Sequence, residues 1–229
     1  MNIVECRDVK KTYRKGKVEV NALNGVSLTI KKGAFVALAG PSGSGKTTML
    51  NIIGGLDLAD SGRITVDGNA LDKMTQSELA SLRLQKVGFV FQAYNLIPVL
   101  SAFENVEFVM LLQGVPSAKR RELARAILED VGLEGKYDRR PAELSGGEQQ
   151  RVAVARAIVS NPSIVLADEP TANLDSKTGK GLLEMMRQMN EKKKATFIFS
   201  THDKMVMDYA RRLVLIRDGL VADDQVREG

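Results

Sequence analysis

Three short apolar runs predict buried strands: Phe35–Ala39, Ser163–Ala167 and Ala195–Phe199. Each run is rich in β-branched or aromatic residues and ends at a polar or glycine-rich turn. None alternates between apolar and polar positions, which is typical of a parallel sheet covered on both faces. The runs therefore predict the centre of a parallel sheet.

Longer stretches between these runs predict helices, including Ala118–Val131, Gly147–Val159 and Lys177–Lys193. Strands that alternate with helices indicate an α/β fold with a mostly parallel sheet. At the start of the chain, Ile3–Val9 and Val18–Ile30 alternate in polarity and predict an antiparallel β edge.

The middle of the chain, Thr75–Asp130, is mostly helical, with a strand signal only at Val87–Phe91. We interpret this part as a helical lobe inserted into the α/β core. A length of 229 residues suits one domain with such a lobe. We expect one domain over 1–229, with the core at approximately 1–92 and 162–229 and the lobe at 93–161.

The composition is that of an ordinary globular protein, with 44% hydrophobic and 27% charged residues. The net charge of +5 is compatible with phosphates, nucleic acid or an anionic membrane surface, and also with a plain solvated basic face. Cys6 is the only cysteine and His202 the only histidine. A disulfide within the chain, a cysteine zinc cluster and a two-histidine metal site are therefore excluded.

No apolar run has the length of a membrane span, and charged residues interrupt the first ten positions, so no signal peptide is expected. These features predict a soluble cytosolic chain. If it acts at a membrane, a partner must cross the bilayer.

A phosphate-loop motif, G-x-x-x-x-G-K-T, follows the first predicted strand and precedes a helical stretch, Thr48–Gly54. Its glycines let backbone N–H groups surround phosphates, and the helix adds its positive N-terminal end. Lys46 would contact the β- and γ-phosphates, and the Thr47 hydroxyl would bind Mg²⁺. The candidate ATP-binding residues of this loop are Gly40, Pro41, Ser42, Gly43, Ser44, Gly45, Lys46, Thr47 and Thr48.

Two carboxylates, Asp168 and Glu169, follow the strand run at Ser163–Ala167. Ligands of open α/β sheets bind at the carboxyl ends of the strands. Asp168 would hold Mg²⁺ and Glu169 would polarise the attacking water. An acid after a strand is a weak signal alone, and it becomes strong together with the phosphate loop.

Leu144–Arg151 reads LSGGEQQR, and Ser145-x-x-Glu148 within it predicts a capping box that opens a helix. Two glycines at the helix start also suit the close approach of a phosphate. With this segment the chain resembles an ATP-binding-cassette (ABC) ATPase, the motor subunit of an ABC transporter. Five residues match the family's signature motif: Ser145, Gly146, Gly147, Glu148 and Gln149.

The resemblance covers essentially the whole chain and implies a head-to-tail homodimer with two composite sites. The signature of one subunit would close over the γ-phosphate held by the phosphate loop of the other. Ser145, Gly146 and Gly147 would therefore act in trans.

Four further positions match family sites. Tyr13 stands where the family has an aromatic residue that stacks on adenine, although a plain edge-strand tyrosine is an alternative. Gln92 matches the glutamine loop, which contacts Mg²⁺ and the attacking water. Asp175 matches the loop that crosses the dimer interface, and His202 matches the switch histidine that senses the γ-phosphate.

The segment Ala93–Val106, and also Asn51–Asp57, resemble the lipoprotein-release (LolD), macrolide-efflux (MacB) and cell-division (FtsE) group of the family. Ala172 and Met49 depart mildly from that group's pattern. Few residues follow the last predicted strand, Leu213–Arg217, so we expect no C-terminal regulatory domain, and the maltose-type ATPases that carry one are disfavoured.

The resemblance implies an ATPase, with ATP and Mg²⁺ as cofactors, that drives a membrane partner handling lipoproteins, lipids or amphiphiles. Integral membrane subunits would contact the Gln92–Val106 segment, at the cytoplasmic face of the inner membrane. A regulatory ATPase of the cell-division type is an alternative. A nucleic-acid-linked ABC ATPase is a further alternative, but no basic stripe with interleaved aromatics supports it, so no nucleic acid is expected.

Overall fold

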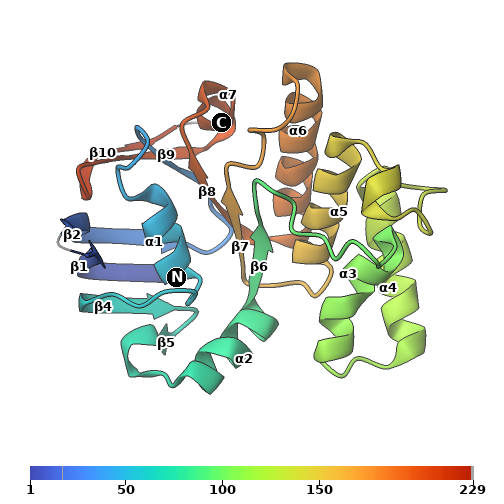
Figure 1. The fold of residues 1–229 in the computed structure, drawn as a ribbon, viewed down its shortest axis with the longest axis horizontal. Helices are drawn as coiled ribbons and strands as arrows, with labels where there is room; N and C mark the ends of the chain where they lie inside the picture. Colours follow the sequence, from blue (N-terminus) through green and yellow to red (C-terminus); the bar gives the residue numbers. More distant parts are fainter. Residues whose placement is uncertain (17, 228–229) are drawn as a thin grey trace.

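The predicted apolar runs form the centre of a six-stranded sheet in the computed structural model, which describes residues 1–16 and 18–227 (Figure 1). The strand order is β10-β9-β3-β8-β7-β6, and only β10 runs antiparallel to its neighbour. The strands are β3 (Phe35–Ala39), β6 (Val87–Val90), β7 (Ile164–Asp168), β8 (Thr196–Thr201), β9 (Arg212–Arg217) and β10 (Leu220–Val226). The predicted α/β fold with a mostly parallel sheet is confirmed.

A second, antiparallel sheet has the order β2-β1-β4-β5. Its strands are β1 (Asn2–Lys15), β2 (Val18–Lys31), β4 (Ser61–Val66) and β5 (Asn69–Ala70). The antiparallel pairing of the first two strands is confirmed. Strands β1 and β2 belong to this separate sheet. The antiparallel edge of the parallel sheet is β10 instead, which follows β9, the last strand that the sequence predicted.

The two faces of the parallel sheet carry separate apolar cores. Along β3, Val36 and Leu38 lie in a core that includes Met49 and Ile53 of helix α1 (Lys46–Ile53) and reaches residues of the antiparallel sheet. Phe35 and Ala37 lie in the other core, with α5 (Gly146–Ile158) and α6 (Ser176–Lys193). A strand's side chains alternate between faces, so one fully apolar strand supplies both layers.

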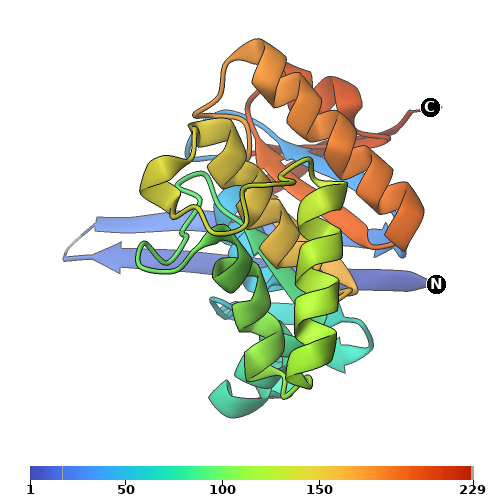
Figure 2. The ribbon, with the colours of Figure 1, turned by 90° about the vertical axis from the view of Figure 1, so that its right-hand side faces the viewer.

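Helix α1 (Lys46–Ile53) therefore lies between the two sheets, while α3, α4, α5 and α6 cover the opposite face of the parallel sheet (Figure 2). The remaining helical bounds are α2 (Gln76–Lys86), α3 (Ala102–Leu112), α4 (Ser117–Asp130), α5 (Gly146–Ile158), α6 (Ser176–Lys193) and α7 (Lys204–Tyr209), with short 3₁₀ turns at Leu71–Lys73 and Pro141–Glu143. The boundary of the helical lobe at 93–161 stays a prediction. Across the described residues, no helix has both the length and the apolar character needed to cross a bilayer.

Candidate nucleotide site

The phosphate loop turns sharply between β3 and α1, and three of its glycines have positive φ values: 151° at Gly40, 78° at Gly43 and 103° at Gly45. A Cβ atom at Gly40 would lie 2.1 Å from the carbonyl oxygen of Ile216, and one at Gly45 would lie 2.3 Å from that of Ala22. Both the left-handed backbone and the close packing therefore require glycine.

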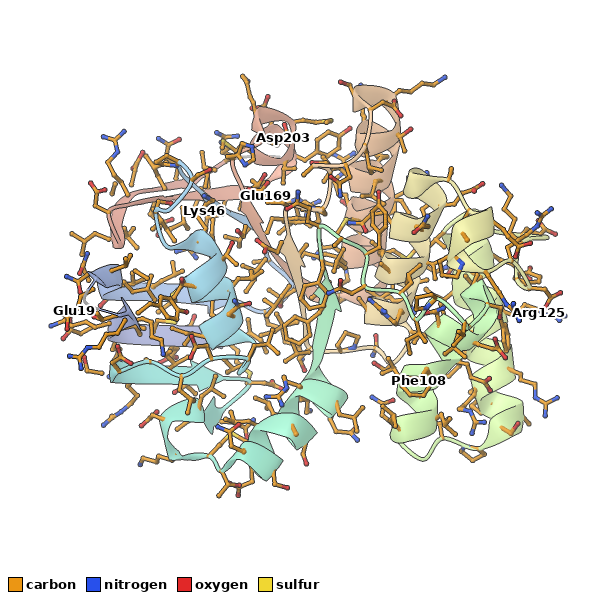
Figure 3. The ribbon with its side chains drawn as sticks, in the orientation of Figure 1. Glu19, Lys46, Phe108, Arg125, Glu169 and Asp203 are labelled. Carbon is orange, nitrogen blue, oxygen red and sulfur yellow. The ribbon has the colours of Figure 1, made fainter. Side chains whose placement is uncertain are left out.

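Lys46 begins α1 and is only 6% exposed. Its Nζ donates a hydrogen bond of 2.8 Å to the carbonyl oxygen of Pro41, across its own loop. Burial lowers the pKa of Lys46, and the negative charges of Glu169 and Asp168 oppose that shift. The ammonium group thus lies near both strand-end carboxylates, at the carboxyl ends of the parallel strands. Figure 3 shows Lys46 and Glu169 at this edge of the sheet.

Thr47 and Asp168 form a pair of oxygen donors. The Thr47 hydroxyl donates to Asp168 Oδ1 at 3.0 Å and lies 3.5 Å from Ser200 Oγ. Hydroxyl and carboxylate oxygens suit Mg²⁺, which usually takes one or two protein ligands together with substrate phosphates and water. No cluster of three or more acidic, histidine or cysteine side chains suited to a metal occurs in the described part of the chain.

Glu169 follows β7 with a positive φ of 45°. Its carboxylate accepts from the Thr201 hydroxyl at 3.1 Å and lies 2.6 Å from Nδ1 of His202. Since a carboxylate only accepts, His202 donates its Nδ1–H, and Nε2 has no hydrogen-bond partner among the described residues. Thr201 was not singled out in the sequence, although its place before His202 at the end of β8 could have indicated it.

The backbone around Gln92 is tied to two other segments. Asn173 donates its side-chain amide to the carbonyl oxygen of Gln92 at 2.9 Å. The buried amide of Gln150 donates to the carbonyl oxygens of Phe91 at 3.4 Å and of Pro170 at 2.8 Å. Sequence reasoning missed Gln150, whose place next to the signature was its only signal.

Tyr13 lies on β1 with 40% of its surface exposed. Its hydroxyl donates to Asp57 Oδ2 at 2.6 Å, and Lys11 Nζ lies over the ring, 5.3 Å from the centroid. Burial and the hydrogen bond to Asp57 raise the pKa of Tyr13, and the hydroxyl of Thr48, on α1, opposes that shift. The tyrosine is therefore near the helix that carries the phosphate loop.

The signature segment has the expected capping box. Ser145 caps α5, its Oγ accepts from the Glu148 backbone N–H at 3.4 Å, and its own N–H donates to the Glu148 carboxylate at 2.8 Å. A Cβ at Gly146 would meet the Tyr94 hydroxyl at 2.9 Å, and one at Gly147 would meet the Thr178 methyl at 2.5 Å. The two glycines thus also allow close packing within the chain.

The remaining signature residues and Asp175 make local contacts. Glu148 forms an ion pair with Lys136, and Gln149 donates to the Leu144 carbonyl at 3.1 Å. Asp175 caps α6 and accepts hydrogen bonds from Thr178, which lower its pKa. None of these contacts involves the phosphate loop.

Within one chain, the signature and the phosphate loop are not brought together. Helix α1 packs against one face of the parallel sheet, and α5 packs against the other. In the described residues, no hydrogen bond or ion pair joins 145–149 to 40–48. The structure groups Lys46, Thr47, Asp168, Glu169 and His202. Ser145–Gln149 stand at the start of α5, which lies apart from α1 (Figure 1).

A lysine-bearing glycine loop beside two strand-end carboxylates on this core defines a phosphate-loop nucleoside triphosphatase. The family model described as ABC transporter matches residues 23–172, and the chain belongs to that family. It is an ABC-type ATPase cassette.

The similar proteins are ABC transporter components. The chain is 48% identical over 223 residues to the macrolide export ATP-binding/permease protein MacB of Syntrophobacter fumaroxidans, covering 96% of this chain but 31% of that protein. It is 47% identical to an uncharacterised ABC transporter ATP-binding protein of Thermotoga maritima, over 96% and 93% of the two chains. The chain thus spans about a third of its MacB relatives and nearly all of the Thermotoga protein.

A solved structure of an ATP-binding cassette has a TM-score of 0.91 and 42% identity, covering 99% of each chain. It is described as a dimeric, post-hydrolysis state of MJ0796, bound to ADP and Pi. The corresponding protein of Methanocaldococcus jannaschii is an uncharacterised ABC transporter ATP-binding protein. These relatives support the group resemblance inferred from Ala93–Val106.

Proposed function

We propose that this cassette is the ATP-hydrolysing motor of a transporter that moves lipoproteins, lipids or amphiphiles. The observation that carries the ATPase assignment is the convergence of Lys46, Thr47, Asp168 and Glu169 at the carboxyl ends of β3 and β7. Residues 40–48 would cradle the triphosphate. Thr47 and Asp168, with Gln92, would hold Mg²⁺, which would neutralise phosphate charge.

Glu169 is the proposed general base. Its carboxylate is oriented by the Thr201 hydroxyl and by the His202 Nδ1–H, and it would accept a proton from the attacking water. Because Nδ1 is engaged with Glu169, Nε2 of His202 is free to contact the γ-phosphate. It donates a hydrogen bond there only as the imidazolium form.

We further propose a head-to-tail homodimer in which Ser145, Gly146 and Gly147 complete the site of the other subunit. Support comes from the position of α5, which lies across the parallel sheet from α1, and whose residues 145–149 make no hydrogen bond or ion pair with residues 40–48 among the described residues. The similar MJ0796 cassette is described as dimeric. Asp175, at the exposed start of α6, would lie near the two-fold axis.

The membrane partner would dock near Gln92–Val106. A groove of about 390 Å³ adjoins that segment and is lined by apolar and basic side chains, among them Arg83, Phe89, Phe91, Val109 and Arg156. The MacB relatives are named as ATP-binding/permease proteins, and this chain covers 31% of the length of one of them. The complex would lie at the cytoplasmic face of the inner membrane.

Mixing two inactive variants tests the trans arrangement. Lys46→Ala damages the phosphate loop and Ser145→Arg damages the signature, so each homodimer should lack ATPase activity. In a head-to-tail heterodimer both lesions fall in one composite site and leave the other intact, so activity should reappear on mixing.

The control mixes Lys46→Ala with Glu169→Gln. Both residues serve the site of their own chain, so the heterodimer has one lesion in each site and should stay inactive. If Ser145 served its own phosphate loop, mixing Lys46→Ala with Ser145→Arg would restore nothing, and the trans proposal would be wrong.

A further inference from the structure

A single carboxylate, Asp57, holds the Tyr13 hydroxyl and the Lys11 ammonium at the same time. Its Oδ2 accepts from Tyr13 at 2.6 Å, and its Oδ1 accepts from Lys11 Nζ at 2.9 Å. Oδ1 also accepts from the backbone N–H of Leu58 at 2.7 Å, which fixes the carboxylate itself. Burial alone would raise the pKa of Asp57, but these hydrogen bonds outweigh it and place the pKa below its usual range.

Lys11 is also held by residues that follow Asp57 in the chain. Its Nζ donates to the Leu58 carbonyl at 2.7 Å and lies 3.5 Å from Asp60 Oδ1, and only 13% of its side chain is exposed. The same ammonium lies 5.3 Å from the centroid of the Tyr13 ring. Lys11 therefore covers one face of the ring, and the exposed part of the ring is left for a ligand.

These contacts hold the Tyr13 side chain in one orientation, whereas its place on β1 alone would leave several rotamers open to it. Tyr13 is 40% exposed, and an exposed tyrosine on a β-strand usually samples more than one rotamer. A side chain that is already ordered loses less freedom when a ligand stacks on it. Asp57 follows α1, the helix that begins with Lys46, so one rigid segment links the ring to the phosphate loop.

We propose that Asp57 is a positioning residue for the nucleotide base, which holds Tyr13 as a preformed platform for an adenine ring. This rests on the proposed role of Tyr13 in stacking on adenine. Lys11 supports the platform by covering one face of the Tyr13 ring. Its positive charge on that face favours stacking of an electron-rich purine on the opposite face of the ring.

The test measures the affinity of purified cassette variants for MgADP, which carries the base, and for magnesium tripolyphosphate, which does not. Asp57→Ala should raise the dissociation constant of MgADP by about two- to tenfold, the range expected for losing one preordered side chain. It should leave that of tripolyphosphate unchanged. Asp57→Asn keeps one acceptor oxygen for the Tyr13 hydroxyl but loses the acceptor of Lys11 and of the Leu58 N–H, so its MgADP affinity should fall between those of Asp57→Ala and the wild type.

Two comparisons separate positioning from other roles. Tyr13→Phe breaks the same hydrogen bond, so combining it with Asp57→Ala should weaken MgADP binding no further than either change alone. Asp72→Asn is the control, because Asp72 is an exposed acid on the 3₁₀ turn at Leu71–Lys73 and has no hydrogen bond or ion pair to Lys11, Tyr13 or Asp57 in the described residues. It should bind both probes like the wild type.

Three results would overturn the proposal. Equal weakening of MgADP and tripolyphosphate binding by Asp57→Ala would show a general structural role. Unchanged MgADP binding in Asp57→Ala, with weaker binding in Tyr13→Ala, would refute the positioning role and keep the Tyr13 platform. Unchanged MgADP binding in Tyr13→Ala would refute the platform itself.

Discussion

Gln150 is the buried side chain that joins the two loops flanking the proposed catalytic residues. It is fully buried, and its Nε2 donates to the carbonyl oxygens of Pro170 at 2.8 Å and Phe91 at 3.4 Å. Pro170 follows Glu169, and Phe91 precedes Gln92. The change to test is Gln150→Met, which keeps the length of the side chain and removes both donors.

The expected loss of stability follows from these contacts. The buried Pro170 carbonyl loses its 2.8 Å partner, which costs about 1–3 kcal/mol, and the 3.4 Å contact adds little. Gln150 Oε1 has no hydrogen-bond partner among the described residues, so removing it offsets part of that cost. The net effect should be a loss of about 1–2 kcal/mol, or about 2–8 °C in melting temperature for a domain of this size.

The effect on turnover should exceed the effect on binding. Glu169 has a positive φ of 45°, and the adjacent Pro170 carbonyl is one of the contacts that hold the backbone there. Small displacements of a catalytic group are costly, so we expect kcat to fall by about tenfold or more while MgADP affinity stays close to wild type. Thermal melting, phosphate release and calorimetric titration measure the three quantities.

The matched control is Gln188→Met on the exposed side of α6, which should leave all three quantities unchanged. A Gln150→Met protein that melts and turns over like the wild type would refute this account of the two loops.

Two glycines give opposite predictions for the same substitution. Gly88→Ala on β6 should destabilise the fold by about 1–3 kcal/mol, because its Cβ would lie 2.1 Å from the backbone oxygen of Ala157 on α5. Gly181→Ala on α6 should stabilise it by about 0.5–1 kcal/mol, since the new Cβ meets only the end of the Arg151 side chain, at 3.6 Å. Urea unfolding of the two variants beside the wild type checks both, and a reversed order would contradict the packing of α5 on β6.

Apolar strands and motif-bearing turns were predictable from the sequence. The bounds of β3 are those expected, and the strands before Glu169 and His202 fall within two residues of their predicted starts and ends. Strand β10 was missed because most of its residues are exposed and it includes the acidic pair Asp223 and Asp224. This segment forms a strand because it pairs with β9, and its own composition does not predict one.

The supporting contacts of the site were beyond sequence reasoning. Gln150 and Asn173 reach the loop around Gln92 from 59 and 81 positions away in the chain, and Asp57 reaches Tyr13 from 44. Such pairs depend on how the helices and sheets pack, which no local pattern encodes. Motifs with built-in geometry, such as the capping box at Ser145, were predictable because both partners lie within one turn.

The central claim, that Glu169 is the general base of an ATPase working as a head-to-tail dimer, is tested most directly by Glu169→Gln. The variant keeps the shape of the side chain but cannot accept the proton, so hydrolysis should fall by about 10²–10⁴-fold while MgATP still binds. Unhydrolysed ATP would then bridge Lys46 and the partner's Ser145, so size-exclusion chromatography should show a dimer in MgATP and a monomer without it. A Glu169→Gln protein that hydrolyses ATP at the wild-type rate would contradict the assigned base, and an inactive one that stays monomeric in MgATP would contradict the dimer.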